Sequence, residues 1–192
     1  MSSPMSRQPP TSWLTLSNAL TSMRLIAAPF FCALIAAGSW GAAFTIFWLA
    51  VVSDLLDGRL ARARNETSAF GGILDHGSDA TFVTLGNLAL ATSGVVPLLL
   101  PIVIVAAFVQ YALDSRILSG RALRTSRLGR WNGILYFFPA GIVVTREVLG
   151  LASPGNAVVF AIGWILVVST SISMIDRLWN LLAARAASAS GS

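Results

Sequence analysis

The chain has 192 residues, of which 55% are hydrophobic and 11% charged, and its mean hydropathy is +0.75. This composition is too apolar for a soluble globular domain and predicts an integral membrane protein, which by length is a single domain. The net charge of +5 comes from arginine alone, set against eight acidic residues. Because the arginines fall in short segments between apolar runs, the charge indicates membrane orientation rather than nucleic-acid binding.

Six apolar segments follow one another along the chain, and several are close to the ~20 residues that a helix needs to cross the hydrocarbon layer. They span roughly 23–37, 40–54, 71–93, 95–118, 131–149 and 156–182. We therefore predict an all-α bundle of six transmembrane helices, preceded by an interfacial helix around 13–20. Residues 1–12 are expected to form a disordered tail, 13–185 the membrane domain and 186–192 a flexible tail.

The arginines mark one side of this bundle. They follow the second apolar segment, fill the connection 116–130 between the fourth and fifth segments, and lie near both ends of the chain, whereas Arg146 alone lies on the opposite side. The positive-inside rule then predicts that both termini and the segment around residues 54–79 face the cytoplasm. We expect the plasma membrane, the inner one in a bacterium.

Four of the eight acidic residues lie within strongly apolar sequence, at Asp54, Asp57, Asp75 and Asp79. Asp54 and Asp57 are three residues apart and share a helix face, and Asp75 and Asp79 are four apart on a second helix. The polar stretch between them can turn the chain, so the two acidic faces are predicted to meet near one membrane surface. A carboxylate cluster within a membrane indicates a functional site.

Four carboxylates at close range raise each other's pKa unless cations compensate them. A set of oxygen ligands without cysteine or a histidine pair favours Mg²⁺, Mn²⁺ or Ca²⁺ over zinc. Gly58, Ala61 and Gly71 leave the helix surfaces bare beside the acids, so that a flat or bulky ligand could approach the backbone there.

The run from Asp54 to Asp79 resembles the signature of the CDP-alcohol phosphotransferase family, D-x2-D-G-x2-A-R-x8-G-x3-D-x3-D. Every fixed position is present, namely Asp54, Asp57, Gly58, Ala61, Arg62, Gly71, Asp75 and Asp79. A weaker resemblance lies upstream, where the family often has Pro-Asn-x2-Thr-x2-Arg. This chain has Asn18, Thr21 and Arg24 at those positions, with Ser17 in place of the proline.

The resemblance implies an enzyme of phospholipid biosynthesis that transfers a phosphatidyl group from CDP-diacylglycerol to an alcohol and releases CMP. It implies two Mg²⁺ or Mn²⁺ ions held by Asp54, Asp57, Asp75 and Asp79, with Asp79 also the general base. It further implies a nucleotide pocket lined by Gly58, Ala61, Arg62 and Gly71, and a homodimer. Glycerol phosphate ranks first as acceptor, ahead of inositol, inositol phosphate or serine, although Ala80 replaces the lysine that glycerophosphate-transferring members commonly carry.

Residues outside the signature give weaker predictions. Asn18, Thr21 and Arg24 are candidates for the donor or acceptor pocket or for shaping the metal site, and an interfacial anchor explains them about as well. Asp114 and Arg116 either line the acceptor pocket or form a solvated pair.

Three further features are open to more than one interpretation. His76 is expected to pack or to support the site rather than to catalyse. The arginine-rich segment 116–130 binds an acceptor phosphate or lipid headgroups, or only sets orientation. Asp176 and Arg177 are expected to form an ion pair at a helix end.

Other classes of protein fit less well. A membrane prenyltransferase should show two separated Asp-rich motifs and more spans. A cation carrier, the main non-enzymatic alternative, should distribute its acids across the membrane depth. Acids that merely pair with Arg59, Arg62 and Arg64 would not require Gly58 and Gly71, and a degenerate family member acting as a partner subunit would not need the intact signature.

Overall fold

The computed structural model describes residues 16–64, 69–117 and 127–189, and side chains within 21–55, 76–114 and 128–183. All regular structure in these ranges is helical. The helices are α1 (Leu16–Ala36), α2 (Trp40–Arg64), α3 (Ala69–Thr92), α4 (Leu99–Ile117), α5 (Arg127–Leu135), α6 (Phe137–Leu149) and α7 (Asn156–Ala189). The all-α prediction is therefore confirmed.

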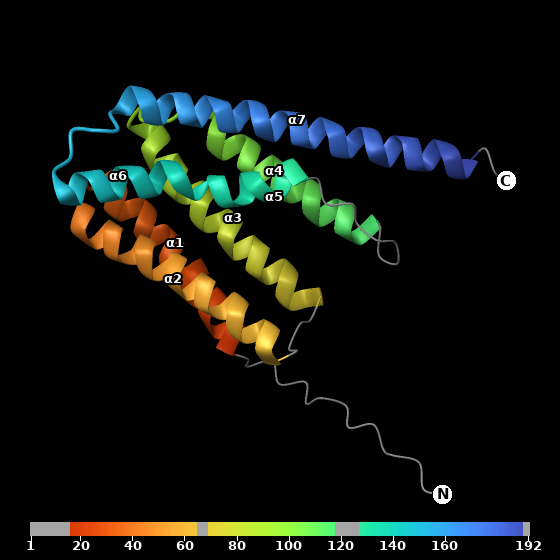
Figure 1. Ribbon diagram of the computed structural model, residues 1–192, viewed down its shortest axis with the longest axis horizontal. Coiled ribbons are helices and arrows are strands. Elements are labelled where there is room, and N and C mark those ends of the chain that lie inside the picture. Colours follow the sequence, from red (N-terminus) through yellow and green to blue (C-terminus); the bar gives the residue numbers. More distant parts are fainter. Residues whose placement is uncertain (1–15, 65–68, 118–126, 190–192) are drawn as a thin grey trace, which may run out of the picture.

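The helices run back and forth, so the molecule has two ends (Figure 1). One end gathers the start of α1, α3 and α5 and the last turns of α2, α4 and α7, and we call it the carboxylate end because Asp54 and Asp79 lie near it. The other end holds the connections α1–α2, α3–α4 and α6–α7. Central helix α3 packs against α1, α4 and α6, while α2 packs against α1 and α6.

Glycines in the left-handed conformation follow three of the helices at the far end, α1, α3 and α6. Gly38 and Gly94 have φ values of +66° and +71°, in the left-handed region that glycine adopts without steric cost. The amides of Ser39 and Val95 then donate back to Leu34 O and Leu90 O, each at 2.9 Å. These bonds satisfy helix-end carbonyls and turn the chain into the next helix.

The start of α1 differs from the prediction. Residues 16–20 belong to α1 itself, which continues unbroken to Ala36, so the separate interfacial helix predicted around 13–20 is wrong for the part that the structure describes. Leucine and alanine at positions 16, 19 and 20 are good helix formers, and no glycine or proline separates them from the apolar run. The predicted residues 13–15 and both predicted tails lie outside the described residues, apart from 186–189 at the end of α7.

The fifth predicted segment is divided at Tyr136 into α5 and α6. Pro139 explains the break, because it lacks the amide that would bond to Leu135 O one turn earlier and its ring crowds that carbonyl. Buried Asn87 of α3 ties the break to the centre of the bundle, since its Nδ2 donates to Tyr136 O at 3.0 Å and to Val83 O at 2.8 Å. The sequence contained this signal in Pro139.

An aromatic cluster fixes α1, α2, α3 and α6 against one another. Phe31 and Phe82 stack with ring centroids 4.7 Å apart, and Phe47 and Phe137 lie 5.8 to 6.4 Å from their neighbours in the cluster. A Cβ on Gly86 would come within 2.5 Å of the Phe31 ring, so the small residue permits this approach. The cluster lies one to two turns from Asp54 and Asp79 along α2 and α3, and it holds these helices in place beneath the two acids.

Large apolar side chains cover much of the outside of the bundle, including Leu49 of α2, Ile102 of α4 and Ile165 of α7. By length and hydropathy, one stretch among the described residues could cross a membrane, Asn156–Ala183 with a mean hydropathy of 2.3. Shorter apolar stretches run from Thr21 to Ala36, Trp40 to Leu55 and Leu99 to Asp114. The six apolar segments are thus helical, and their spanning of a bilayer stays a prediction.

Candidate active site

A large cavity of about 1130 Å³ opens between α2, α3, α4, α5, α6 and α7. It reaches from Asp54 and Asp79 at the carboxylate end to Arg146 and Pro154 at the far end. Its middle is mostly apolar and aromatic, with Phe47, Val83, Phe137 and Phe138 among the lining residues. A ligand filling it would therefore combine a charged end with an apolar body.

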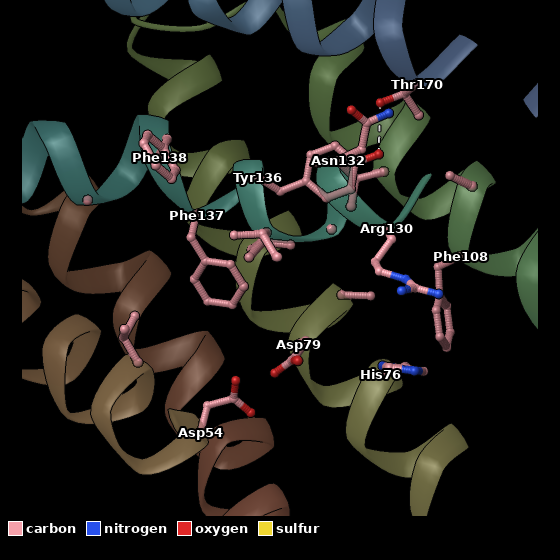
Figure 2. A pocket seen from close by; sticks show the side chains of 18 of the residues that line it. Asp54, His76, Asp79, Phe108, Arg130, Asn132, Tyr136, Phe137, Phe138 and Thr170 are labelled. Carbon is pink, nitrogen blue, oxygen red and sulfur yellow. Dashed lines mark hydrogen bonds between the residues drawn. The ribbon is translucent and has the colours of Figure 1, made fainter. Parts of the chain in front are cut away.

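Asp54 and Asp79 meet at one end of this cavity. Figure 2 shows them on α2 and α3, with their carboxylates in the same space. Their side chains are 44% and 26% exposed, so both carboxylates remain accessible from the cavity. The prediction that the two acidic helix faces meet is confirmed for this pair.

Buried Arg24 of α1 joins the two acids from behind. Its Nη2 donates to Asp54 Oδ1 at 3.0 Å, and its Nη1 donates to Asp79 Oδ1 and, at 3.5 Å, to Ser78 Oγ. The Arg24 side chain is only 2% exposed, and Thr21, one turn earlier on α1, is buried too. Arg24, predicted as a candidate for the pocket or for shaping the metal site, thus contacts the carboxylates directly, whereas Thr21 does not line the cavity.

The remaining signature residues are placed only by their backbones. Asp57, Gly58, Ala61 and Arg62 follow Asp54 on α2, and Gly71 and Asp75 precede Asp79 on α3. Asp57 is three residues beyond Asp54 and Asp75 is four before Asp79, so each lies one helical turn further toward the carboxylate end. Their side chains, like those of Asn18 on α1 and Arg116 on α4, lie outside the described part.

The donors already in place suit a hard cation. Among the described side chains no group of three or more acidic, histidine or cysteine residues comes together, since only two of the four predicted ligands are included. Asp54 and Asp79 nevertheless approach closely enough to share one cationic partner, the Arg24 guanidinium. Carboxylate oxygens so arranged fit Mg²⁺ or Mn²⁺, and they would provide part of its ligand shell.

Two arginines face the same cavity from the other side. Arg130 of α5 and Arg177 of α7 line it, and Figure 2 shows Arg130 extending into the space near Asp79 and His76. His76 is exposed, and its ring meets Tyr111 edge-on at 5.4 Å, in agreement with the packing role expected for it. A cation–π contact at 5.4 Å places the Arg177 guanidinium over the same Tyr111 ring.

Asp114 has a partner that the sequence analysis missed. Its Oδ2 lies 3.7 Å from Arg177 Nε, and both side chains are largely buried. The part of the chain that the structure describes shows no ion pair between Asp176 and Arg177, so that predicted pair is wrong, and Arg177 pairs with Asp114 across the α4–α7 interface instead. Asp114 lines a smaller groove between α4 and α7, and it contacts the main cavity only through Arg177.

Polar side chains also line the wall formed by α5 and α7. The hydroxyls of Tyr136 and Thr170 are hydrogen-bonded at 2.7 Å, and Ser169 Oγ donates to Asn132 Oδ1 at 2.7 Å. All four residues lie at or beside the α5–α6 break, where α7 packs against α5. Sequence reasoning did not single them out, because isolated polar residues in apolar helices gave no pattern of spacing.

Comparison with known proteins agrees with this arrangement. Residues 14–175 match the CDP-alcohol phosphatidyltransferase family, and the chain belongs to that family. The matched range includes the whole signature and extends into α7.

Individual relatives cover the chain to different extents. A cardiolipin synthase (CMP-forming)/mitochondrial hydrolase fusion protein of Schizosaccharomyces pombe is 28% identical over 77% of this chain and 28% of its own length. A cardiolipin synthase (CMP-forming) of Streptomyces coelicolor is 34% identical over 48% of this chain and 46% of its own length. A probable phosphatidylglycerophosphate synthase of Mycobacterium tuberculosis is 28% identical over 84% of this chain and 80% of its own length. The matches thus span less than half of the first two relatives and most of the third.

Proposed function

We propose that this protein transfers a phosphatidyl group from CDP-diacylglycerol to an alcohol that carries a phosphate, with release of CMP. The observation that carries the proposal is the convergence of Asp54 and Asp79 at the charged end of a cavity whose body is apolar. A CDP-linked lipid has the same division, with a charged diphosphate at one end and acyl chains at the other. Membership of the family supports the reaction type.

The cation site would comprise Asp54, Asp57, Asp75 and Asp79, with Mg²⁺ or Mn²⁺, two per site, as the metals we expect. When bound, the cations would neutralise the diphosphate and stabilise CMP as the leaving group. Gly58, Ala61, Arg62 and Gly71 follow or precede these acids on the same two helices and are proposed to contact the nucleotide. Asp79 is proposed to take the proton from the acceptor hydroxyl, because its carboxylate faces the cavity and is partly exposed.

Arg130 and Arg177 support an acceptor that carries a phosphate. Both line the cavity near the two carboxylates, and guanidinium groups pair well with phosphate oxygens. The relatives are named for phosphatidylglycerophosphate and cardiolipin, two lipids that form when a phosphatidyl group is added to a glycerol already bearing a phosphate. Glycerol phosphate and phosphatidylglycerol are therefore the acceptors to test first, ahead of inositol or serine.

A position in a membrane follows from the same chemistry. The many exposed apolar side chains would be covered by lipid if the six apolar segments span the bilayer. The arginine distribution supports a cytoplasmic carboxylate end, where a soluble nucleotide could leave. A homodimer is the assembly we expect for the family.

The experiment is to measure CMP release by the purified full chain with CDP-diacylglycerol, Mg²⁺ and a panel of acceptors. We expect release that depends on the cation and on an acceptor bearing glycerol and phosphate, and product analysis would name the lipid. Cation-dependent release with serine or free inositol alone would contradict the acceptor assignment. Absence of CMP release with every acceptor would contradict the proposed reaction and favour the non-enzymatic cation carrier.

A further inference from the structure

Arg24 is an unusual residue to find behind an acidic site. It comes from α1, contacts carboxylates of both α2 and α3, and is almost fully buried. Burying a guanidinium is costly, and the cost is recovered only through close pairing with anions. In this structure Asp54 and Asp79 are among the anions that stabilise the buried Arg24 guanidinium.

Packing contacts besides this ion pair also hold the two acid-bearing helices in place. α1 packs along both α2 and α3, and the stacked rings of Phe31 and Phe82 join α1 to α3. Phe47 joins α2 to the same cluster. Because these contacts also position α2 and α3, we infer that the main effect of Arg24 on Asp54 and Asp79 is electrostatic.

We propose that Arg24 is an internal counter-cation, which compensates Asp54 and Asp79 until a divalent cation takes its place. This inference rests on the proposed function, in which the same carboxylates hold Mg²⁺ or Mn²⁺. The Arg24 guanidinium and a divalent cation bound to the same carboxylates are both positive, and they would repel each other strongly even at the effective dielectric of a protein surface. Cation binding is then an exchange, in which at least one carboxylate oxygen turns from the guanidinium to the metal.

The proposal makes a prediction whose sign separates it from a purely positioning role. If Arg24 competes with the cation, its neutral replacement binds the cation more tightly. If Arg24 only orients the carboxylates, the same replacement binds it more weakly. Lysine keeps the charge but offers a single ammonium in place of the two guanidinium nitrogens that contact Asp54 and Asp79, so it should lie between.

The experiment measures Mn²⁺ affinity of the full chain in detergent micelles from the signal of free Mn²⁺ in electron paramagnetic resonance. We expect Arg24→Gln to bind Mn²⁺ at least ~10-fold more tightly than the unsubstituted protein, with Arg24→Lys intermediate. Arg146→Gln is the matched control, because it also removes a buried arginine, at the other end of the bundle, and it should leave the affinity unchanged. Equal or weaker binding by Arg24→Gln would overturn the exchange. Absence of Mn²⁺ binding by the unsubstituted protein would instead overturn the proposed cation site, and the exchange with it.

A second measurement is made on the unsubstituted protein, so its result does not depend on whether a substituted site folds correctly. Nitrogen resonances of the arginine side chains are recorded on the unsubstituted protein with EDTA and with Mg²⁺, and Arg24→Lys serves only for assignment. We expect Mg²⁺ to shift the Arg24 signals and to speed their hydrogen exchange ~10-fold, because the protecting hydrogen bonds are released. The Arg146 signals are the internal control. Unchanged Arg24 signals under saturating Mg²⁺ would overturn the proposal while leaving catalysis by the protein intact.

Discussion

A buried arginine lies near each end of the bundle, and the two differ in what surrounds them. Arg24 pairs with two carboxylates that face the cavity. Arg146 donates to Pro154 O at 2.8 Å, to Asn156 Oδ1 and to Glu147 Oε1 at 3.1 Å, all within the α6–α7 connection and its borders. The first arginine is compensated by charges that a ligand could also use, and the second by groups that close a loop.

The partners distinguish the functional site around Arg24 from the structural contacts of Arg146 more clearly than burial does. Both arginines are less than 9% exposed; Arg146 lines the cavity, and Arg24 contacts two residues that line it. Only at the carboxylate end do the partners come from helices distant in sequence, so that their meeting requires the whole fold. The chemistry is accordingly expected at Asp54 and Asp79, with the far end serving stability.

The largest expected effect comes from removing one carboxylate at the active end. Asp79→Asn should lower the rate of CMP release by ~10²- to 10⁴-fold, because a general base and cation ligand is lost. Glu147→Gln makes the same chemical change at the far end and should leave the rate unchanged. The rates are compared at saturating CDP-diacylglycerol and acceptor. Similar losses in the two variants would show that the two ends do not differ as argued.

Removing the Arg146 side chain at the far end should lower stability rather than the rate of CMP release. Arg146→Ala removes the hydrogen bonds to Glu147, Pro154 O and Asn156, and we expect a loss of about 1.5 kcal/mol in unfolding free energy. Thermal or denaturant unfolding in detergent micelles measures the change. Arg130→Ala is the comparison, since it also removes an arginine, but an exposed one, and we expect at most about 0.5 kcal/mol. Equal destabilisation by the two substitutions would contradict the role given to Arg146.

A third prediction concerns the arginine side of the active end. Asp114→Asn removes the anion that holds Arg177 against Tyr111, and it should raise the KM for a phosphate-bearing acceptor by about 10-fold. The KM for CDP-diacylglycerol should change much less. Asp176→Asn, one residue before Arg177 on exposed helix surface, is the matched control. A larger rise in the KM for CDP-diacylglycerol than in the KM for the acceptor would contradict the assignment of Arg177 to the acceptor.

Much of the carboxylate end could be predicted from the sequence, because its information is local and periodic. Asp54 and Asp57, and likewise Asp75 and Asp79, share helix faces by spacing alone. In the structure Asp54 on α2 and Asp79 on α3 line the same cavity and share Arg24. Gly38 and Gly94 end helices through a property of single residues, since glycine adopts the left-handed conformation without steric cost.

The partners of Arg24 and of Asp114 could not be predicted, because they depend on which helices become neighbours. Arg24 is 30 residues from Asp54 and 55 from Asp79 in the chain. Arg177 contacts Asp114 across the α4–α7 interface instead of the adjacent Asp176. Pairings of this kind are fixed by tertiary packing, about which hydropathy and charge patterns carry little information.

The smallest expected effect tests the region between the two ends, where Tyr136 and Thr170 join the α5–α6 break to α7. Tyr136→Phe should cost about 1 kcal/mol of unfolding free energy, because a buried hydroxyl is left without its partner. Thr170→Val should cost a similar amount, and the double substitution should cost less than the sum of the two, by about 1 kcal/mol. Unfolding of all four proteins in the same detergent completes the cycle. Strictly additive losses would mean that the two hydroxyls act separately, and that packing alone holds the broken helix against α7.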